Sequence, residues 1–573
     1  MKIKSITTRI LWLLFILMIS FSIIQAQSKT TREIILSAMK DELSRNMKQL
    51  QLEHLQKPFF ISYTIRDIRT MEVSATLGSI INSDEDHFRN HNVRVMVGDY
   101  KLTDENFQDP GSTGFQNTLL QGTDDLPLDD DYYGIRRALW ISTDWVYKSA
   151  SEKYERKKAA IEQQELTEEE KSLEDFSRAP VVKYIEPPGQ FVLNRAKWET
   201  IAKEISVVFK NYPDIYSSRV RFFFFQADAF FINSEGTEVV QPLTIVYSII
   251  NAGTQAIDGD PLNDMMVYVG TVPQDLPSSQ SIKQDVKQMA ENLVMLRTAP
   301  VFEESYTGPV MFENQAVAEL IAQQLFERSG TLLAYRTPIT AGRTSGRGMP
   351  SQSLEDKIGT RILARDLTIK ALPTMETFSG VRLIGSYKVD EEGVRPPDEI
   401  ILVENGFLKT LLNNRTPTLK VKESNGHDRS VINLGRYASS RLGPSVIQMT
   451  TSDGKPVAEM KNELLQLAKD EGLEYGILIR KVMSLSNPIL IYRVNVEDGE
   501  EQLVRSAMLS NFSLSSLRRV YSASTEQFLY QRGGVPASYI VPQALIFEEL
   551  EIEQQKRSYT PKLPVVSSPL LEN

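Results

Sequence analysis

Apolar residues recur along the chain at two spacings, and these spacings predict where helices and strands lie. Residues 30–54 repeat apolar positions every three or four residues, which predicts a first helix. Residues 59–65 and 93–97 are strand-like, and a further helix, capped by Ser281 and Gln284, carries one apolar stripe. The first half of the chain therefore mixes strands with amphipathic helices.

A charged stretch follows a polar loop at residues 101–134 and predicts a long helix that ends near Gln164. Thr167 and Glu170 then form a capping box, in which a hydroxyl and a carboxylate satisfy free backbone amides at the start of a second helix. We expect a helical hairpin at about residues 135–178. Its charged face is either solvated or a docking arm for a partner.

Residues 220–231 are almost entirely apolar and include four consecutive phenylalanines, Phe222 to Phe225. The turn residues 233–236, with the sequence Asn-Ser-Glu-Gly, come next, so the pattern predicts a strand, a turn and a second strand. Successive side chains of a strand point to opposite faces. Such a strand must be covered on both sides, by the protein core or by a partner.

The second half opens with a short strand at residues 309–312 and a helix from Gln315 to about Arg328, with Gly330 placed to cap it. Another helix is expected at about residues 456–471, and Asp498-Gly499 predicts a hairpin. The succession of elements predicts an α+β fold of two domains, with mixed or antiparallel sheets packed against helices. We place these domains at residues 27–300 and 301–552, followed by a proline-containing tail at residues 553–573.

The first 26 residues have the pattern of a signal peptide. Lys2, Lys4 and Arg9 precede an apolar run at residues 10–24, and Ala26 is a small residue at the expected cleavage point. The run is shorter than the roughly 20 residues of a membrane-spanning helix, so an uncleaved anchor is the alternative. We expect an exported protein, periplasmic or secreted, with no transmembrane segment after the leader is removed.

Composition narrows the possible chemistry. The 573 residues include 64 basic and 74 acidic side chains, a net charge of −10 that disfavours a nucleic-acid partner. The absence of cysteine excludes disulfides, thiolate zinc sites and a cysteine nucleophile. The chain also has no phosphate-binding loop, dinucleotide fingerprint, nucleophile elbow or H-E-x-x-H helix.

Three of the four histidines offer candidate chemistry. His87 and His91 would form a metal clamp on a helix, but the residues after them alternate as a strand, which favours two ordinary surface histidines. His427 lies in a loop rich in turn residues, where it is either a hydrogen-bonding surface residue or a contact for a ligand.

Several phrases of the second half, in their order, resemble the TldD/PmbA family of zinc metallopeptidases, also described as modulators of DNA gyrase. They are Ser353 to Gly359, Gly385-Ser386-Tyr387 with Asp390 to Val394, Leu402 to Lys409, and the segment from Leu503-Val504-Arg505 to Leu517. The Asn-Ser-Glu-Gly turn of the first half adds to the resemblance.

The resemblance implies a two-domain α+β protein whose catalytic members cut unfolded peptides with zinc. Those members work beside an inactive sister subunit, and the two enclose a chamber. Their motif is H-E-x-x-x-H on the helix after the short strand, with a cysteine near the C-terminus as a further ligand. Histidines five residues apart lie about 140° apart on a regular α-helix, so such a site requires a local distortion such as a π-bulge.

This chain departs from that motif. Ala322 and Glu327 replace the two histidines, and Gln323 replaces the general base. An alanine has no lone pair and a glutamine amide cannot take a proton at neutral pH. We therefore expect no zinc, no other cofactor and no catalytic residue, in an exported pseudoenzyme that pairs with a zinc-bearing sister subunit or binds unfolded peptide as a homodimer.

Two other interpretations stay open at this point. The first is an active metallopeptidase with different zinc ligands, such as Glu327 with His427 or the pair His87 and His91. The second is a structural protein of the cell envelope that uses the helical hairpin and the aromatic strand as docking surfaces.

Overall fold

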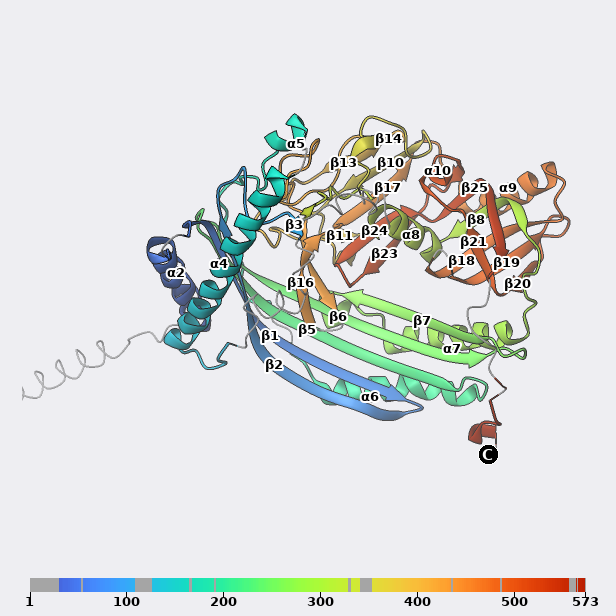
Figure 1. Ribbon diagram of the computed structural model, residues 1–573. Coiled ribbons are helices and arrows are strands. Elements are labelled where there is room, and N and C mark those ends of the chain that lie inside the picture. The colour runs from blue at the N-terminus through green and yellow to red at the C-terminus, as the bar shows by residue number, and fades with distance from the viewer. Residues whose placement is uncertain are drawn as a thin grey trace, which may run out of the picture.

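A computed structural model gives the structure of the chain (Figure 1). It describes residues 30–571 except 53–54, 109–125, 164–166, 190–191, 328–330, 341–352, 434–435, 485–486, 556–562 and 564. The expected leader, Gly330 and most of the polar loop before the hairpin lie outside the described residues. The architecture is α+β, as the sequence predicted, with one long curved sheet from the first half and two further sheets from the second.

The first sheet is built from unusually long antiparallel strands. Its order is β2-β1-β5-β6, and both β7 and the parallel β4 pair with β6. The strands are β1 (Pro58–Thr76), β2 (Ser79–Val97), β4 (Lys183–Ile185), β5 (Ser217–Asn233), β6 (Glu238–Gln255) and β7 (Pro261–Gly270). The predicted short strands at residues 59–65 and 93–97 are therefore parts of two 19-residue strands.

The four phenylalanines lie in the middle of β5 and are buried on both faces. Phe222 and Phe224 pack with Trp198 and the helices below the sheet, whereas Phe223 and Phe225 pack in a cluster with Ile384 of the second half. Alternation along the strand sends successive rings to opposite sides. Protein core, rather than a partner, covers this strand on both faces.

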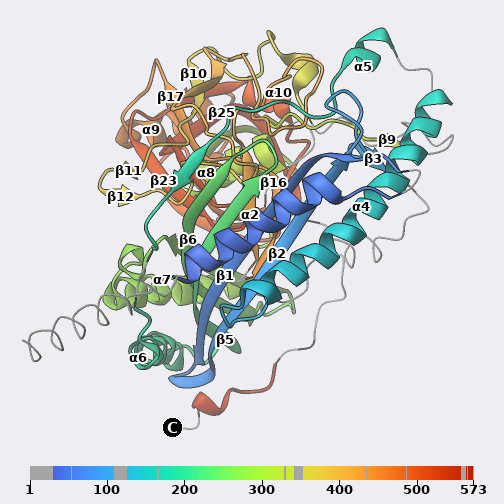
Figure 2. The ribbon, with the colours of Figure 1, turned by 90° about the vertical axis from the view of Figure 1, so that its left-hand side faces the viewer.

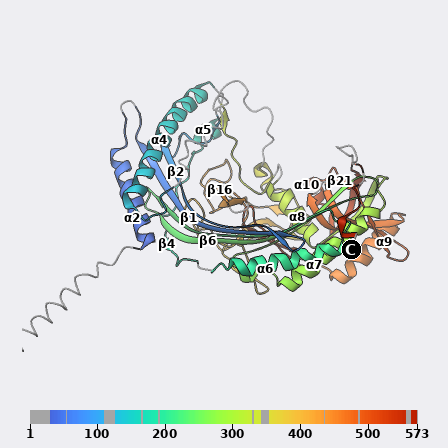
Figure 3. The ribbon, with the colours of Figure 1, turned by 90° about the horizontal axis from the view of Figure 1, so that it is seen from below.

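Four helices cover this sheet. Two of them, α6 (Arg195–Ser206) and α7 (Ser279–Thr298), lie along the underside of the sheet (Figure 3). The other two, α2 (Thr31–Gln49) and α4 (Tyr132–Glu162), lie side by side across one end of the sheet (Figure 2). The helix expected from Ser281 begins two residues earlier, because the hydroxyl of Ser278 accepts the backbone N–H of Ser281 as its cap. No helix of the described part of the chain is long and apolar enough to cross a membrane.

The second arm of the expected helical hairpin is short. Thr167 and Glu170 form the predicted capping box, but α5 (Glu168–Ser172) has five residues and ends well before residue 178. Tertiary contacts explain the difference. Phe176 is fully buried and packs edge-on against Phe60, so the chain after α5 is drawn into the core instead of continuing as a helix.

The second half contains two sheets with one helix between them. The seven-stranded sheet has the order β20-β19-β18-β8-β25-β21 with β22 paired to β25, and the six-stranded sheet has the order β14-β13-β10-β17-β24-β23. Its helix α8 (Gln315–Ala322) contacts β18 and β8 of one sheet and β23 and β24 of the other. Both sheets and α8 share one hydrophobic core.

The strands of the first of these sheets are β8 (Tyr306–Glu313), β18 (Tyr475–Ser484), β19 (Asn487–Asn495), β20 (Glu501–Val504), β21 (Ala507–Ser510), β22 (Val520–Ala523) and β25 (Ala544–Gln554). Those of the second are β10 (Leu367–Ala371), β13 (Ile400–Glu404), β14 (Phe407–Leu408), β17 (Val446–Thr451), β23 (Gln527–Arg532) and β24 (Ala537–Pro542). Smaller ladders are β3 (Phe107–Gln108) with β9 (Ile339–Thr340), β11 (Thr377–Phe378) with β12 (Val381–Arg382), and β15 (Asp428–Asn433) with β16 (Arg436–Leu442).

Two remaining helices complete the second half, α9 (Val457–Asp470) and α10 (Leu514–Leu517). α9 matches the helix predicted at residues 456–471, and the Asp498-Gly499 hairpin joins β19 to β20 as expected. The two halves meet where loops of the second half rest on the curved sheet (Figure 1). There the hydroxyl of Tyr247, on β6, donates to the carbonyl of Gly533 at 2.7 Å.

Candidate functional site

The helix that carries the degenerate motif is distorted where the resemblance requires it. α8 is regular up to Ala322, and residues Gln323–Glu327 form a π-helical turn. A π turn has more residues per turn than an α-helix, so it brings residues five apart closer to one face. The backbone at these positions therefore has the distortion that the resemblance implies for an H-E-x-x-x-H site.

A hydrogen-bonded chain replaces the expected general base. Gln323 donates through Nε2 to Oε2 of Glu319 at 2.7 Å, one turn earlier on α8. The hydroxyl of Tyr530, on β23, donates to the other oxygen of Glu319 at 2.8 Å. Glu319 and Gln323 are buried and Tyr530 is half-buried, and burial followed by the Glu319 charge raises the pKa of Tyr530. Gln323 thus holds a carboxylate in place instead of taking a proton.

Arg532, at the end of β23, places a fixed cation beside the motif. Its Nη1 lies 2.6 Å from Oε1 of Glu327, and its Nε lies 3.5 Å from Oε1 of Glu319. Burial opposes the guanidinium charge, but Glu319, Tyr539 and Glu327 outweigh that effect and raise the pKa of Arg532. Arg532 therefore neutralises both carboxylates near the π turn.

These residues do not fit the zinc ion that the resemblance implies. Ala322 is fully buried and has no donor atom, and the two nearby carboxylates are engaged by Arg532. A zinc ion needs three or four deprotonated or neutral donors from histidine, cysteine or carboxylates. Within the described residues, no three such side chains are grouped closely enough to hold a metal ion.

We expect Arg532→Met to lower the free energy of unfolding by about 1–2 kcal/mol, because the buried Glu319 keeps only neutral partners and the half-exposed Glu327 pair is lost. Urea denaturation followed by circular dichroism measures the change. Arg519→Met is the matched control, since its pair with Glu549 is 3.7 Å apart and half-exposed at both ends. An equal loss in both variants would contradict the proposed pairing.

His427 is buried, not on the surface as one interpretation of its loop suggested. Its Nδ1 lies 2.9 Å from the carbonyl of Asn425, and its Nε2 lies 3.2 Å from Oγ of Ser445. Burial, followed by the charge of Arg429, lowers the pKa of His427 to about 3. Both ring nitrogens contact protein atoms, and among the described residues neither His427 nor Glu327 belongs to a group of three side chains that could hold a metal ion.

The low pKa of His427 predicts a pH-dependent stability difference. The folded state keeps the ring neutral while the unfolded chain takes up a proton below about pH 6.5, so the unfolded state binds more protons and wild type loses stability as pH falls. His427→Asn removes this penalty. We expect the variant to gain about 1.4 kcal/mol relative to wild type for each pH unit from 6.5 towards 5.

Chemical denaturation of both proteins at pH 8, 6.5 and 5 measures this difference, and a stability gap that is constant across the three pH values would contradict the assignment of a neutral buried ring. Comparison of the two proteins cancels the opposite pH dependence of Asp428 nearby. Burial, and then Glu392, raises the pKa of Asp428 to about 7, so that group loses stability as pH rises.

The pair His87 and His91 lies on β2, where residues four apart share a face but are about 13 Å apart along the strand. His87 bonds to Asp67 at 2.6 Å, and the buried His91 bonds to Ser142 at 2.8 Å. Two imidazoles at that separation cannot ligate one metal ion at about 2 Å each. The expectation of two surface histidines is wrong for His91, because α4 covers that part of β2.

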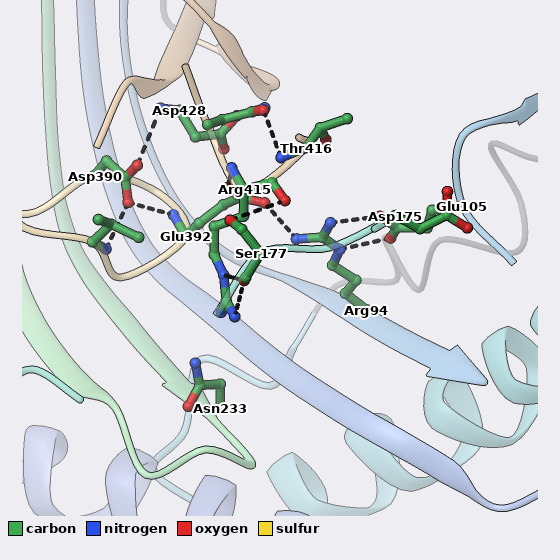
Figure 4. Close-up of polar contacts among 12 residues, drawn as sticks. Arg94, Glu105, Asp175, Ser177, Asn233, Asp390, Glu392, Arg415, Thr416 and Asp428 are labelled. Atoms are coloured by element: carbon green, nitrogen blue, oxygen red, sulfur yellow. Dashed lines mark hydrogen bonds and ion pairs between the residues drawn. The ribbon is translucent and has the colours of Figure 1, made fainter. Parts of the chain in front are cut away.

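A buried polar cluster, which we call the junction cluster, joins the two halves (Figure 4). The guanidinium of Arg415 donates to both oxygens of Glu235, at 2.7 and 2.8 Å, and to the carbonyl of Ser177. Close by, Arg94 of β2 pairs with Glu392 at 2.6 Å. These ion pairs fix loops of the second half onto β2 and onto the turn at the end of β5.

Only indirect signals for this cluster can be found in the sequence. Glu392 lies inside one of the phrases that carry the family resemblance, and Glu235 lies in the Asn-Ser-Glu-Gly turn. Neither phrase reveals its partner, because Arg415 is 180 residues from Glu235 and Arg94 is 298 residues from Glu392. Arg532 and Glu319 near the motif were missed for the same reason.

Comparison with known proteins is consistent with this geometry. Residues 305–553 match the family described as "PmbA/TldA metallopeptidase C-terminal domain". A protein named "Metalloprotease" from Methanothermobacter thermautotrophicus is 25% identical over 326 residues. That alignment covers 53% of this chain and 62% of the relative's length.

Three solved structures share the fold. A candidate modulator of DNA gyrase from Thermotoga maritima has a TM-score of 0.57 at 16% identity, over 90% of this chain and 100% of that one. TldE from Thermococcus kodakarensis has a TM-score of 0.54 at 14% identity, over 90% and 100% of the two chains. A candidate gyrase modulator from Bacteroides thetaiotaomicron has a TM-score of 0.54 at 12% identity, over 91% and 98%.

Proposed function

The chain belongs to the TldD/PmbA family, and from this premise we propose that it is a non-catalytic member that binds unfolded peptide and acts beside a zinc-bearing relative. One observation carries the proposal. On the π-distorted helix where catalytic relatives are expected to hold their ion, Arg532 lies against Glu319 and Glu327, while Ala322 offers no ligand.

The chemistry follows from this arrangement. Hydrolysis by a metallopeptidase needs a metal ion to lower the pKa of its bound water and a nearby base to take the proton. A guanidinium supplies positive charge but has no free orbital for water, and it cannot serve as a base. The side chains at the motif can hold one another in place and neutralise one another's charges, but they cannot generate a hydroxide nucleophile.

The proposed location and partners rest on the sequence. The signal-peptide pattern of residues 1–26 supports export to the periplasm or outside the cell. The name of one structural neighbour, TldE, and the family's pairing of catalytic with inactive subunits support a sister chain as partner. A homodimer that binds peptide is the other assembly compatible with the proposal.

A fluorescein-labelled unfolded peptide tests the proposed function with the purified mature chain. We expect fluorescence anisotropy to rise on binding, and mass spectrometry to show intact peptide after incubation with added zinc. Absence of binding would contradict the peptide-binding role. Cleavage that a chelator stops and that Glu327→Gln abolishes would contradict the non-catalytic role, because Glu327 is the acid at the motif that could ligate zinc.

A further inference from the structure

A cleft of about 410 Å³ opens between the two halves, away from the degenerate motif. Its walls include residues 241–245 of β6 on one side and residues 382–384, 386–391 and 428–430 of the second half on the other. Strand β23 lies between this cleft and the degenerate motif, and its successive side chains point to opposite sides. Tyr530 and Arg532 point to α8, whereas Gln531 accepts from the backbone N–H of Ile384 on the cleft side.

Arg429, in the wall of this cleft, is a buried cation that pairs with no carboxylate among the described residues. Its side chain is 7% exposed, and its guanidinium lies 3.6 Å from the ring centre of Tyr387. The hydrogen bonds of this side chain come from Nη2, which donates to the carbonyls of Gly385 at 3.4 Å and Pro536 at 3.1 Å. Nε donates to no atom in the described part of the chain.

The acids around Arg429 are held by other groups. Asp390 accepts three backbone N–H groups, from Glu392, Val394 and Asp428. Glu391 is paired with Arg66 and accepts the hydroxyl of Ser430. The arginine is therefore fixed by a ring and two carbonyls, and burial lowers the pKa of Arg429 despite the more distant acids.

An arginine fixed in this way is preorganised for an anion, because its planar fork matches a carboxylate or a phosphate. Asp390, Glu391 and Asp428 line the same cleft and form what we call the acidic lip. Burial raises the pKa of Asp390 and of Asp428, and an ammonium beside them would favour their ionised form and donate to their oxygens. A carboxylate and an ammonium on one small molecule satisfy both ends. The cleft volume lies within the range of small-molecule sites, about 300–1,000 Å³.

We propose that this cleft binds a zwitterionic ligand of the amino-acid class, either a free α-amino acid or a short peptide, with its carboxylate on Arg429 and its ammonium at the acidic lip. The ligand bridges β6 to the loops of the second half. This site does not depend on whether the degenerate motif is catalytic, because the two lie on opposite sides of β23.

Isothermal titration calorimetry with the purified mature chain tests the ligand chemistry. The probes are L-alanyl-L-alanine, its C-terminal amide, its N-acetyl derivative and L-alanine. We expect the dipeptide to bind and the amide to bind at least about tenfold more weakly, because it loses the charge-assisted bond to Arg429. The N-acetyl derivative should also bind more weakly, and L-alanine distinguishes a free amino acid from a peptide as the ligand.

Two variants test the residue assignment. We expect Arg429→Gln to weaken dipeptide binding by about tenfold or more, and Arg519→Gln, at a residue that does not line the cleft and pairs with Glu549, to leave it within about twofold. Equal affinity of wild type and a folded Arg429→Gln variant would overturn the proposal. If that variant does not fold, the wild-type probes decide: equal binding of dipeptide and amide, or no binding by the dipeptide or L-alanine at millimolar concentration, overturns it as well.

Discussion

Arg415→Met is expected to lower the free energy of unfolding by about 3–5 kcal/mol, among the largest effects of any single substitution in this chain. The side chain is 1% exposed and donates to Glu235 and to the carbonyl of Ser177. It also lies 3.8 Å from the ring centre of Phe176. Methionine preserves the packing volume but leaves the largely buried Glu235 with only neutral donors, from Tyr100 and Asn233, and removes the guanidinium that donates to the carbonyl of Ser177.

Urea denaturation followed by tryptophan fluorescence measures this effect. Trp140, Trp145 and Trp198 all lie in the first half. Their fluorescence therefore reports on the unfolding of the half to which the Arg415 side chain is hydrogen-bonded. Arg395→Met is the matched control, because Arg395 is exposed and lies 5.2 Å from the ring centre of Tyr184. We expect the control to change stability by less than about 0.5 kcal/mol. A similarly small effect for Arg415→Met would contradict the role assigned to the junction cluster.

The elements of the fold were largely predictable because their signals are local. The capping box at Thr167, the apolar stripe of α7 and the Asp498-Gly499 turn each lie within a short window of sequence. The phenylalanine strand required cover on both faces, and the structure supplies it from two different parts of the chain. The short α5 could not be predicted, because burial of Phe176 against Phe60 ends the hairpin.

The candidate functional site was also only partly predictable from the sequence. The replacement of the motif residues by Ala322, Gln323 and Glu327 was readable from the sequence, and so was the need for a π turn under the family resemblance. The position of the cation beside them could not be predicted, because Arg532 lies 205 residues from Glu327 in sequence. Contacts between distant segments depend on sheet order, which local patterns do not specify.

The second large effect concerns catalysis. The purified chain, tested alone, is expected to hydrolyse unfolded peptide no faster than buffer containing the same zinc concentration. Enzymes accelerate their reactions by at least about a millionfold, and a metallopeptidase depends on metal-bound water for that acceleration. With Arg532 paired to Glu319 and Glu327, the motif lacks both the ligands and the base. Addition of a catalytic sister chain should restore cleavage to the mixture.

Two controls make this null result informative. Thermal denaturation should show that the inactive preparation is folded, and labelled peptide should still bind to it. Glu327→Gln should leave the mixture with the sister chain as active as the wild-type mixture, because Glu327 ligates no metal in the proposed mechanism. Loss of activity with that substitution, or chelator-sensitive cleavage by the chain alone, would contradict the proposal of a non-catalytic subunit.

In the proposed non-catalytic subunit, the Arg532 guanidinium supplies the positive charge at the π turn that a metal ion would supply in a catalytic relative. The zinc content of the folded mature chain, after incubation with excess zinc at pH 7.5 and gel filtration, measures whether this turn holds a metal ion. We expect far less than one zinc ion per chain, with the same low value for Glu327→Gln. One tightly held zinc per wild-type chain, lost in Glu327→Gln, would contradict it.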